Sequence, residues 1–153
     1  MAALGDRLRR RAVHDEGAAA VEFALVSVVL FMLLFGIIDF GLFINANIVV
    51  GNAASVGARS VSLGANTTTA TNTVLNSLSS MPMYSAANAS VSIQCNLQDT
   101  STATGLGAVI ACTDTSTATT KVASVSVDYQ HHWITPVGFG ITTIHRTSEM
   151  VVE

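Results

Sequence analysis

Charge and aromatic rings are both scarce in this chain of 153 residues. Only 11% of the residues are charged and 6% are aromatic, whereas a soluble domain usually carries about 25% charged residues. Basic residues are fewest, with seven Lys and Arg against ten Asp and Glu, and four of the seven are arginines before position 12. The chain therefore lacks the basic surface with which proteins bind nucleic acid, and it is short of the charge of a typical soluble enzyme.

Apolar residues make up 50% of the chain, and they gather in its early part because the Ser and Thr residues nearly all follow position 54. Phe23–Ile44 is a 22-residue apolar run interrupted by few polar residues. About 20 such residues cross the hydrocarbon core of a bilayer. The rest of the chain offers no comparable apolar surface to bury this helix, so we predict a membrane span rather than a core helix. The arginines before it predict a cytoplasmic N-terminus.

A cleaved secretory signal is the alternative interpretation of this run. Such a signal has an apolar region of about 7–15 residues followed by a small-x-small cleavage site. Here the run is longer, and Asp39, Asn45 and Asn47 follow in place of such a site. We therefore expect the apolar segment to stay attached to the rest of the chain.

Three motifs occur in order within the first 60 residues. Gly17–Ala24 reads Gly-Ala-Ala-Ala-Val-Glu-Phe-Ala, Phe35–Gly41 reads Phe-Gly-Ile-Ile-Asp-Phe-Gly, and Asn52–Arg59 reads Asn-Ala-Ala-Ser-Val-Gly-Ala-Arg. Together they resemble the TadE-like minor pseudopilins of tight-adherence (Tad) pilus systems. The resemblance implies a type III (prepilin) signal, which a prepilin peptidase cuts between Gly17 and Ala18. Asp15 and Glu16 depart from the pattern, because the family usually has a basic residue near the cut.

The resemblance also implies partners and a location. Glu22 becomes the fifth residue of the processed chain, and with Phe23 it belongs to the assembly region, where the Glu pairs with the N-terminus of a neighbouring subunit. The implied partners are other pilins or pseudopilins, the prepilin peptidase, pilus platform proteins and the membrane, without nucleic acid or a small-molecule substrate. The implied location is the bacterial inner membrane, crossed once, with the C-terminal domain periplasmic or incorporated in an extracellular pilus.

Asp39 has two interpretations. It lies 17 residues beyond Glu22, about 26 Å along a helix, which places it near the outer headgroups. Alternatively, it makes a polar contact with a partner helix inside the membrane. Small residues at Gly36, Gly41, Gly51 and Gly57 would permit close approach between helices.

The chain is predicted to be α+β and pilin-like, with a cytoplasmic leader (1–17), a long helix (18–63, spanning the membrane at about 23–44) and an exported domain (64–153). The helical pattern begins at about residue 16 and ends near Gly64. Beyond the membrane, its apolar residues recur at helical spacing and predict a stripe that packs against the domain. This stripe consists of Ile44, Ile48, Val49, Val56 and Leu63.

The exported domain is predicted to hold a short helix and an antiparallel sheet of three to four strands. The helix covers residues 66–80, is capped by Thr67–Thr69 and ends at Met81-Pro82. Alternating apolar residues predict strands, and low-complexity tracts predict loops between them. The strands cover 91–97, 108–112, 123–129 and 141–152, and the loops cover 99–104 and 113–120. Cys95 and Cys112 would lie on neighbouring strands and form a disulfide in an exported compartment.

Candidate chemistry is confined to Asp128, His131 and His132, with His145 as a further ligand from another segment. Successive residues of a strand point to opposite faces, so the adjacent histidines cannot easily share one metal. We therefore expect no catalytic site, no metal and no cofactor. The predicted function is that of a minor pilin or pseudopilin. An uncleaved membrane scaffold of the same machinery and a secreted binding module or enzyme are the alternatives.

Overall fold

The chain divides into two compact units: a helical unit, Met1–Phe40, and a sheet unit, Gly41–Glu153. The structure, a computed structural model, describes residues 2–98, 106–112, 120–134 and 140–152, with side chains from residue 17 on except at 106–108. The predicted loops at 99–104 and 113–120, apart from Thr120, lie outside the described residues. Within the described residues, the architecture is the predicted α+β arrangement of a long helix, a short helix and a four-stranded antiparallel sheet.

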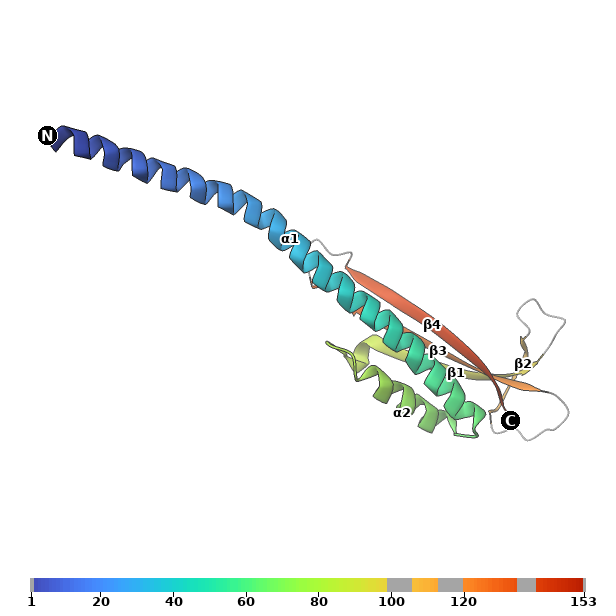
Figure 1. Ribbon diagram of the computed structural model, residues 1–153. Coiled ribbons are helices and arrows are strands. Elements are labelled where there is room, and N and C mark those ends of the chain that lie inside the picture. Colours follow the sequence, from blue (N-terminus) through green and yellow to red (C-terminus); the bar gives the residue numbers. More distant parts are fainter. Residues whose placement is uncertain (1, 99–105, 113–119, 135–139, 153) are drawn as a thin grey trace. The chain divides into compact units, whose positions relative to one another are not determined.

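Helix α1 (Ala2–Ser62) contributes to both units (Figure 1). It begins well before residue 16, so the predicted start was wrong. Residues 2–16 are rich in Ala, Leu and Arg, which are good helix formers. The predicted end near Gly64 is confirmed. Gly64 has a φ of +87°, and the Ala65 N–H donates to the Ser60 carbonyl at 3.1 Å, which is the glycine-terminated Schellman motif.

Helix α2 (Thr67–Leu78) lies where a helix was predicted. Its N-cap is Asn66, whose side chain accepts a hydrogen bond from the Thr69 N–H at 2.8 Å, so the threonines are not the capping residues. Ala70, Val74 and Leu78 recur every four residues on one face and are completely buried. A short 3-10 helix, Ala86–Asn88, then leads into the sheet.

The sheet has the order β2-β1-β3-β4, and each neighbouring pair is antiparallel. The strands are β1 (Ala89–Gln98), β2 (Leu106–Ile110), β3 (Lys121–His132) and β4 (Ile141–Val152). All four predicted strands exist. β2 is shifted toward the N-terminus from the predicted 108–112, because its pairing with β1 ends at Ile110 opposite Cys95.

The sheet has one covered face and one polar face. Along β3, Val125, Val127 and Tyr129 are buried, whereas Ser126 and Asp128 between them point to the other face. Helix α2 and the C-terminal half of α1 lie on the same side of the sheet (Figure 1). The core of the sheet unit is therefore a single layer of side chains between two helices and one face of the sheet.

Small residues of α1 face this core. Within the sheet unit, the buried residues of α1 are Ala46, Val50, Ala53, Ala54, Gly57, Ala58, Val61 and Ser62. The predicted stripe is confirmed for Val49, which is partly buried and packs against the core, and was wrong for its other members, which are exposed. Their exposed fractions are 44% for Ile44, 58% for Ile48, 45% for Val56 and 72% for Leu63.

Gly57 explains why small residues take the covered face. A Cβ atom at this position would lie 2.5 Å from Val74 Cγ2 of α2 and 3.1 Å from Val125 Cγ1 of β3. Carbon atoms in contact are normally about 3.5–4.0 Å apart, so α1, α2 and β3 meet too closely for any side chain here. The same construction at Gly36, Gly41 and Gly51 meets no atom within 4 Å. Gly57 therefore serves the core of the sheet unit rather than a helix contact in the membrane.

A disulfide joins Cys95, near the end of β1, to Cys112, two residues beyond β2. The Cα atoms are 5.1 Å apart, within the usual range for a disulfide. Cys95 is buried in the core cluster. The bond therefore holds the edge strand β2 to the rest of the sheet, at the distance expected from the sequence.

Candidate functional site

The predicted processing and assembly residues lie in one exposed stretch of α1. Gly17, Ala18, Glu22 and Phe23 are all exposed and helical. Residues 18 and 22 are four positions apart, which places them one above the other on the same helix face. Cleavage between Gly17 and Ala18 stays a prediction, as does the role of Glu22 in assembly.

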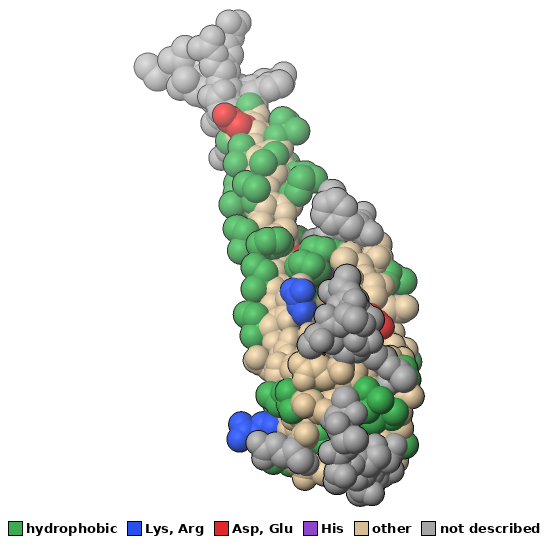
Figure 2. All heavy atoms as spheres, turned by 90° about the vertical axis from the view of Figure 1, so that its right-hand side faces the viewer, with side chains coloured by type: hydrophobic (Ala, Val, Ile, Leu, Met, Phe, Trp, Pro, Cys, Tyr) green, Lys and Arg blue, Asp and Glu red, His purple; other side chains and the backbone are tan. Residues whose placement is uncertain are grey.

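The apolar surface of α1 begins directly after Glu22. An 18-residue window within Gly17–Ser62 has a mean hydropathy of 2.7, and none of it is buried. Hydrophobic side chains cover the exposed surface of this helix (Figure 2), and Phe23 alone is 74% exposed. A helix that is apolar on all sides is stable only when something apolar surrounds it, and its length fits a bilayer.

Asp39 differs from its neighbours on this helix. Its side chain is 2% exposed, while Ile38 and Phe40 on either side are 47% and 57% exposed. A buried carboxylate is stable only when polar groups surround it, so Asp39 needs a polar environment that its apolar neighbours on the helix do not need. A contact between Asp39 and a partner helix stays a prediction.

The apolar surface continues on α1 inside the sheet unit. The outer stripe consists of Ile44, Ile48 and Val56 on α1 together with Leu63, the residue after the helix, and all four are exposed. Arg59, also exposed, is the charged residue among them. In most soluble domains the outward face of a surface helix is polar, so the outer stripe is a candidate contact surface for another protein.

The candidate chemical cluster is divided between the two faces of the sheet. His131 is buried and packs its ring edge-on against Phe43, with 5.6 Å between centroids. Asp128 and His132 lie on the opposite, polar face. Strand alternation predicted that the two histidines point to opposite faces of the sheet, and the structure confirms this.

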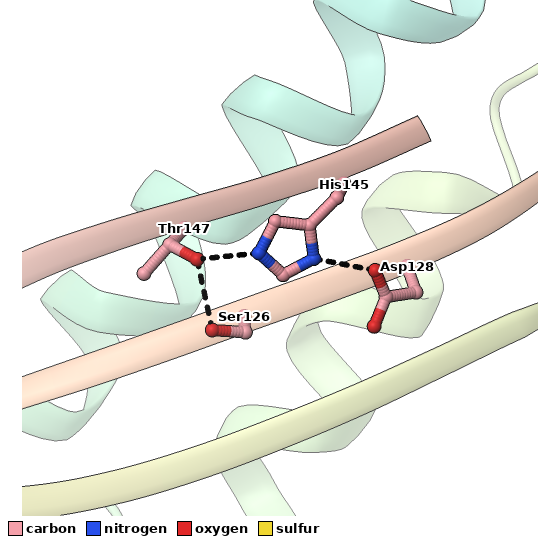
Figure 3. A network of polar contacts seen from close by, with 4 residues as sticks. All are labelled: Ser126, Asp128, His145 and Thr147. Atoms are coloured by element: carbon pink, nitrogen blue, oxygen red, sulfur yellow. Dashed lines mark hydrogen bonds and ion pairs between the residues drawn. The ribbon is translucent and has the colours of Figure 1, made fainter. Parts of the chain in front are cut away.

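Asp128 has a different partner, His145, which lies directly across the β3–β4 ladder. His145 Nδ1 contacts the Asp128 carboxylate, and its Nε2 lies 3.2 Å from Thr147 Oγ1 (Figure 3). Thr147 in turn lies 2.9 Å from Ser126 Oγ. The His145 and Asp128 side chains are 61% and 43% exposed, so this is an open polar network on a flat surface and not an enclosed catalytic site.

No described group of three or more His, Cys, Asp or Glu residues could hold a metal ion. The sheet unit has a cavity of about 40 Å³ lined by Met81, Tyr129, His131 and other residues. Ligand pockets usually enclose roughly 300–1,000 Å³, so this cavity has room for water only. Burial, and secondarily electrostatic repulsion from Tyr84, raises the pKa of Tyr129 beside it.

A comparison with known protein families finds a match, and it lies in the N-terminal region of the chain. Residues 17–59 match the family described as TadE-like protein. The N-terminal helix is therefore similar to TadE-like proteins over these residues. A search of curated proteins and a search of solved structures each found no match to this chain. The match is confined to α1 and covers less than a third of the chain. Together with the apolar helix, it indicates a membrane-anchored, single-pass protein.

The TadE-like match begins at Gly17 and ends at Arg59, so it contains all three sequence motifs. The first motif carries the exposed residues Gly17 and Glu22, and the second carries the buried Asp39. The third has a different purpose, because its small residues, Gly57 among them, form the face of α1 against the core. Sequence reasoning missed this role, although the run of Ala and Gly at helical spacing was the available signal.

Proposed function

We propose that this protein is a minor pilin or pseudopilin subunit of a Tad-type pilus or secretion machine. In this proposal a prepilin peptidase removes residues 1–17, and the processed chain assembles with other subunits through its N-terminal helix. The TadE-like match over residues 17–59 carries the proposal. The exposed apolar surface of α1 supports it, because that surface needs lipid or another subunit around it.

The chemistry of processing would create the group that Glu22 needs. Cutting after Gly17 leaves an α-amino group on Ala18, one helical turn from the Glu22 carboxylate. In a medium of low dielectric constant an isolated charge is costly, while an ammonium and a carboxylate satisfy each other. Glu22 of one subunit would pair with the amino group of its neighbour and set the axial register between the two helices.

The outer stripe would extend this contact beyond the membrane. Ile44, Ile48 and Val56 are exposed on α1 although the sheet unit has its own well-packed core. Burying apolar side chains contributes about 25 cal/mol for each Å² removed from water. Helix-to-helix contact along the stripe would therefore stabilise an assembled state without disturbing the fold of the subunit.

Orientation and location belong to the same proposal. Four arginines precede the span, and basic residues next to a span remain on the cytoplasmic side. The N-terminus would face the cytoplasm of a bacterium, and the sheet unit would lie on the periplasmic side of the inner membrane. The Cys95–Cys112 disulfide agrees with this, because disulfides persist in oxidising compartments.

The Glu22→Ala variant tests the proposal in cells. It should reach the membrane in normal amounts but assemble poorly, because the α-amino group of the neighbouring subunit loses its counter-charge. Glu149→Ala, which removes an exposed carboxylate from β4, is the matched control and should assemble normally. Membrane fractionation measures insertion, and shearing pili from the cells measures assembly. Normal pili with Glu22→Ala would count heavily against the register role.

The N-terminal sequence and mass of the protein isolated from membranes separate this proposal from its rivals. A chain beginning at Ala18 supports the pseudopilin. A chain beginning at Met1 supports an uncleaved scaffold, which the acidic residues Asp15 and Glu16 before the cut favour. A chain beginning after about residue 46 supports a secreted module. That third outcome would remove Phe43 and Ala46, both of which pack in the core of the sheet unit.

A further inference from the structure

Three aromatic rings meet at one end of the sheet unit. Phe43 of α1 stacks on Trp133, with 5.4 Å between ring centroids, and contacts His131 edge-on. His131 and Trp133 also meet edge-on at 5.4 Å. The Trp133 Nε1–H donates to Thr142 Oγ1 at 2.9 Å. These contacts hold the indole ring against α1 at the level of residue 43.

The place of Phe43 in the apolar run of α1 gives its expected depth in a membrane. Phe23–Ile44 is the apolar run, and its 22 residues would rise about 33 Å along a helix, close to the thickness of the hydrocarbon core. Phe43 therefore belongs to the last turn before the outer headgroup region. Since Trp133 stacks on this ring, the residue that follows β3 would lie at the membrane boundary too. Trp is enriched at this depth, because its ring is apolar and its N–H is polar.

Two isoleucines extend the aromatic cluster outward. Ile134 follows Trp133 and is 53% exposed, and Ile141, the first residue of β4, is 58% exposed. Ile141 pairs with His132 across the ladder, which brings it to the same end of the sheet. Asp39, four residues before Phe43 on α1, is buried, and none of the exposed described residues named here is Lys, Arg, Asp or Glu. The surface is suited to apolar contact with acyl chains and not to electrostatic attraction by anionic lipid.

We propose that this end of the sheet unit docks on the membrane, with Trp133, Ile134 and Ile141 in the outer interfacial region of the bilayer. The occupant of the surface is lipid because Trp133 stacks on Phe43, which is itself a residue of the apolar run. The inference goes beyond the proposed function and depends on membrane insertion alone, not on processing or pilus assembly. It gives the chain a second membrane contact besides α1, which would limit the freedom of the sheet unit before assembly.

Trp133 is the single tryptophan of the chain, so fluorescence tests the proposal in the native sequence. The full chain is reconstituted into phosphatidylcholine vesicles that contain lipids brominated at defined depths, which quench tryptophan on contact. Trp133 emission should fall more with bromines near the headgroups than with bromines near the chain ends. In the Trp133→Phe/Ile134→Trp variant, the new and more exposed indole should show the same preference for shallow bromines.

Two further probes in the Trp133→Phe background make the outcome decisive. Leu30→Trp, inside the span, should be quenched by deep bromines and shows that α1 is inserted. Val109→Trp, on the exposed face of β2, should be quenched by aqueous acrylamide and not by any bromolipid. The proposal is overturned if the Leu30 probe is quenched by lipid while the probes at 133 and 134 are not. Acrylamide quenching at 133 and 134 would then indicate exposure to water, and protection from both quenchers would indicate a protein partner such as a second copy.

Discussion

The close approach at Gly57 makes a sharp prediction about the stability of the sheet unit. Replacing Gly57 by Ala puts a methyl carbon 2.5 Å from Val74 Cγ2, where about 3.5–4.0 Å is normal. Val74 is completely buried, and a β-branched side chain in a helix has one strongly preferred rotamer. It therefore cannot rotate away, and either α1 or α2 must move.

The magnitude follows from two opposing effects. Overpacking of a core costs about 1–3 kcal/mol, while Ala is favoured over Gly inside a helix by about 1 kcal/mol. Gly57→Ala should thus lower the free energy of unfolding by about 0–2 kcal/mol. Gly51→Ala is the matched control on the same helix, because its new methyl group meets no atom within 4 Å. It should raise the free energy of unfolding by up to about 1 kcal/mol.

The difference between the two variants isolates packing, because the gain in helix propensity is common to both. That difference should be about 1–3 kcal/mol. The assay is urea unfolding of the full chain in mild detergent, followed by the emission of Trp133, which packs on Phe43 within the sheet unit. In a Val74→Ala background the 2.5 Å contact is removed and the 3.1 Å contact with Val125 Cγ1 remains, so the difference between Gly57→Ala and Gly51→Ala should become smaller. If Gly57→Ala is stabilising in the native background, the reasoning from close approach is refuted.

Two further predictions concern the disulfide and a buried tyrosine. Replacing Cys95 and Cys112 together by Ser should lower the free energy of unfolding by about 3 kcal/mol, as for a crosslink closing a loop of this length; reductant should destabilise the native protein similarly and leave the double variant unchanged. Burial, and secondarily electrostatic repulsion from Tyr84, raises the pKa of Tyr129 in the folded protein. The unfolded state, in which tyrosine ionises near pH 10, therefore loses this proton first, and the native protein should lose stability as the pH rises above about 10. Tyr129→Phe should lose less stability between pH 8 and higher pH in urea unfolding, and equal losses in the two proteins would contradict the proposed cause.

The strands were predictable because apolar and polar side chains alternate along them. Val125 and Val127 point to the core while Ser124 and Ser126 point away, and this period of two is visible in the sequence. The contact between Asp128 and His145 was not predictable in the same way. It depends on the register between β3 and β4, which alternation along a single strand does not determine.

The orientation of α1 was mispredicted for a related reason. Between residues 44 and 63 this helix has apolar residues on every side, so periodicity favoured the larger ones as the core face. The choice is made by the tertiary neighbours Val74 and Val125, which leave room only for Gly57. The large residues Ile48 and Val56 are consequently displaced to the exposed face.

The two-sided use of α1 has a consequence for how its sequence can change. A residue on the inner face must fit atoms of its own chain, while a residue on the outer stripe must fit lipid or another molecule. A substitution on either face of the helix therefore alters a contact, either with the core of the same chain or with the molecules around it. On the polar face of the sheet, by contrast, Ser, Thr and other polar side chains meet water and can be exchanged one at a time.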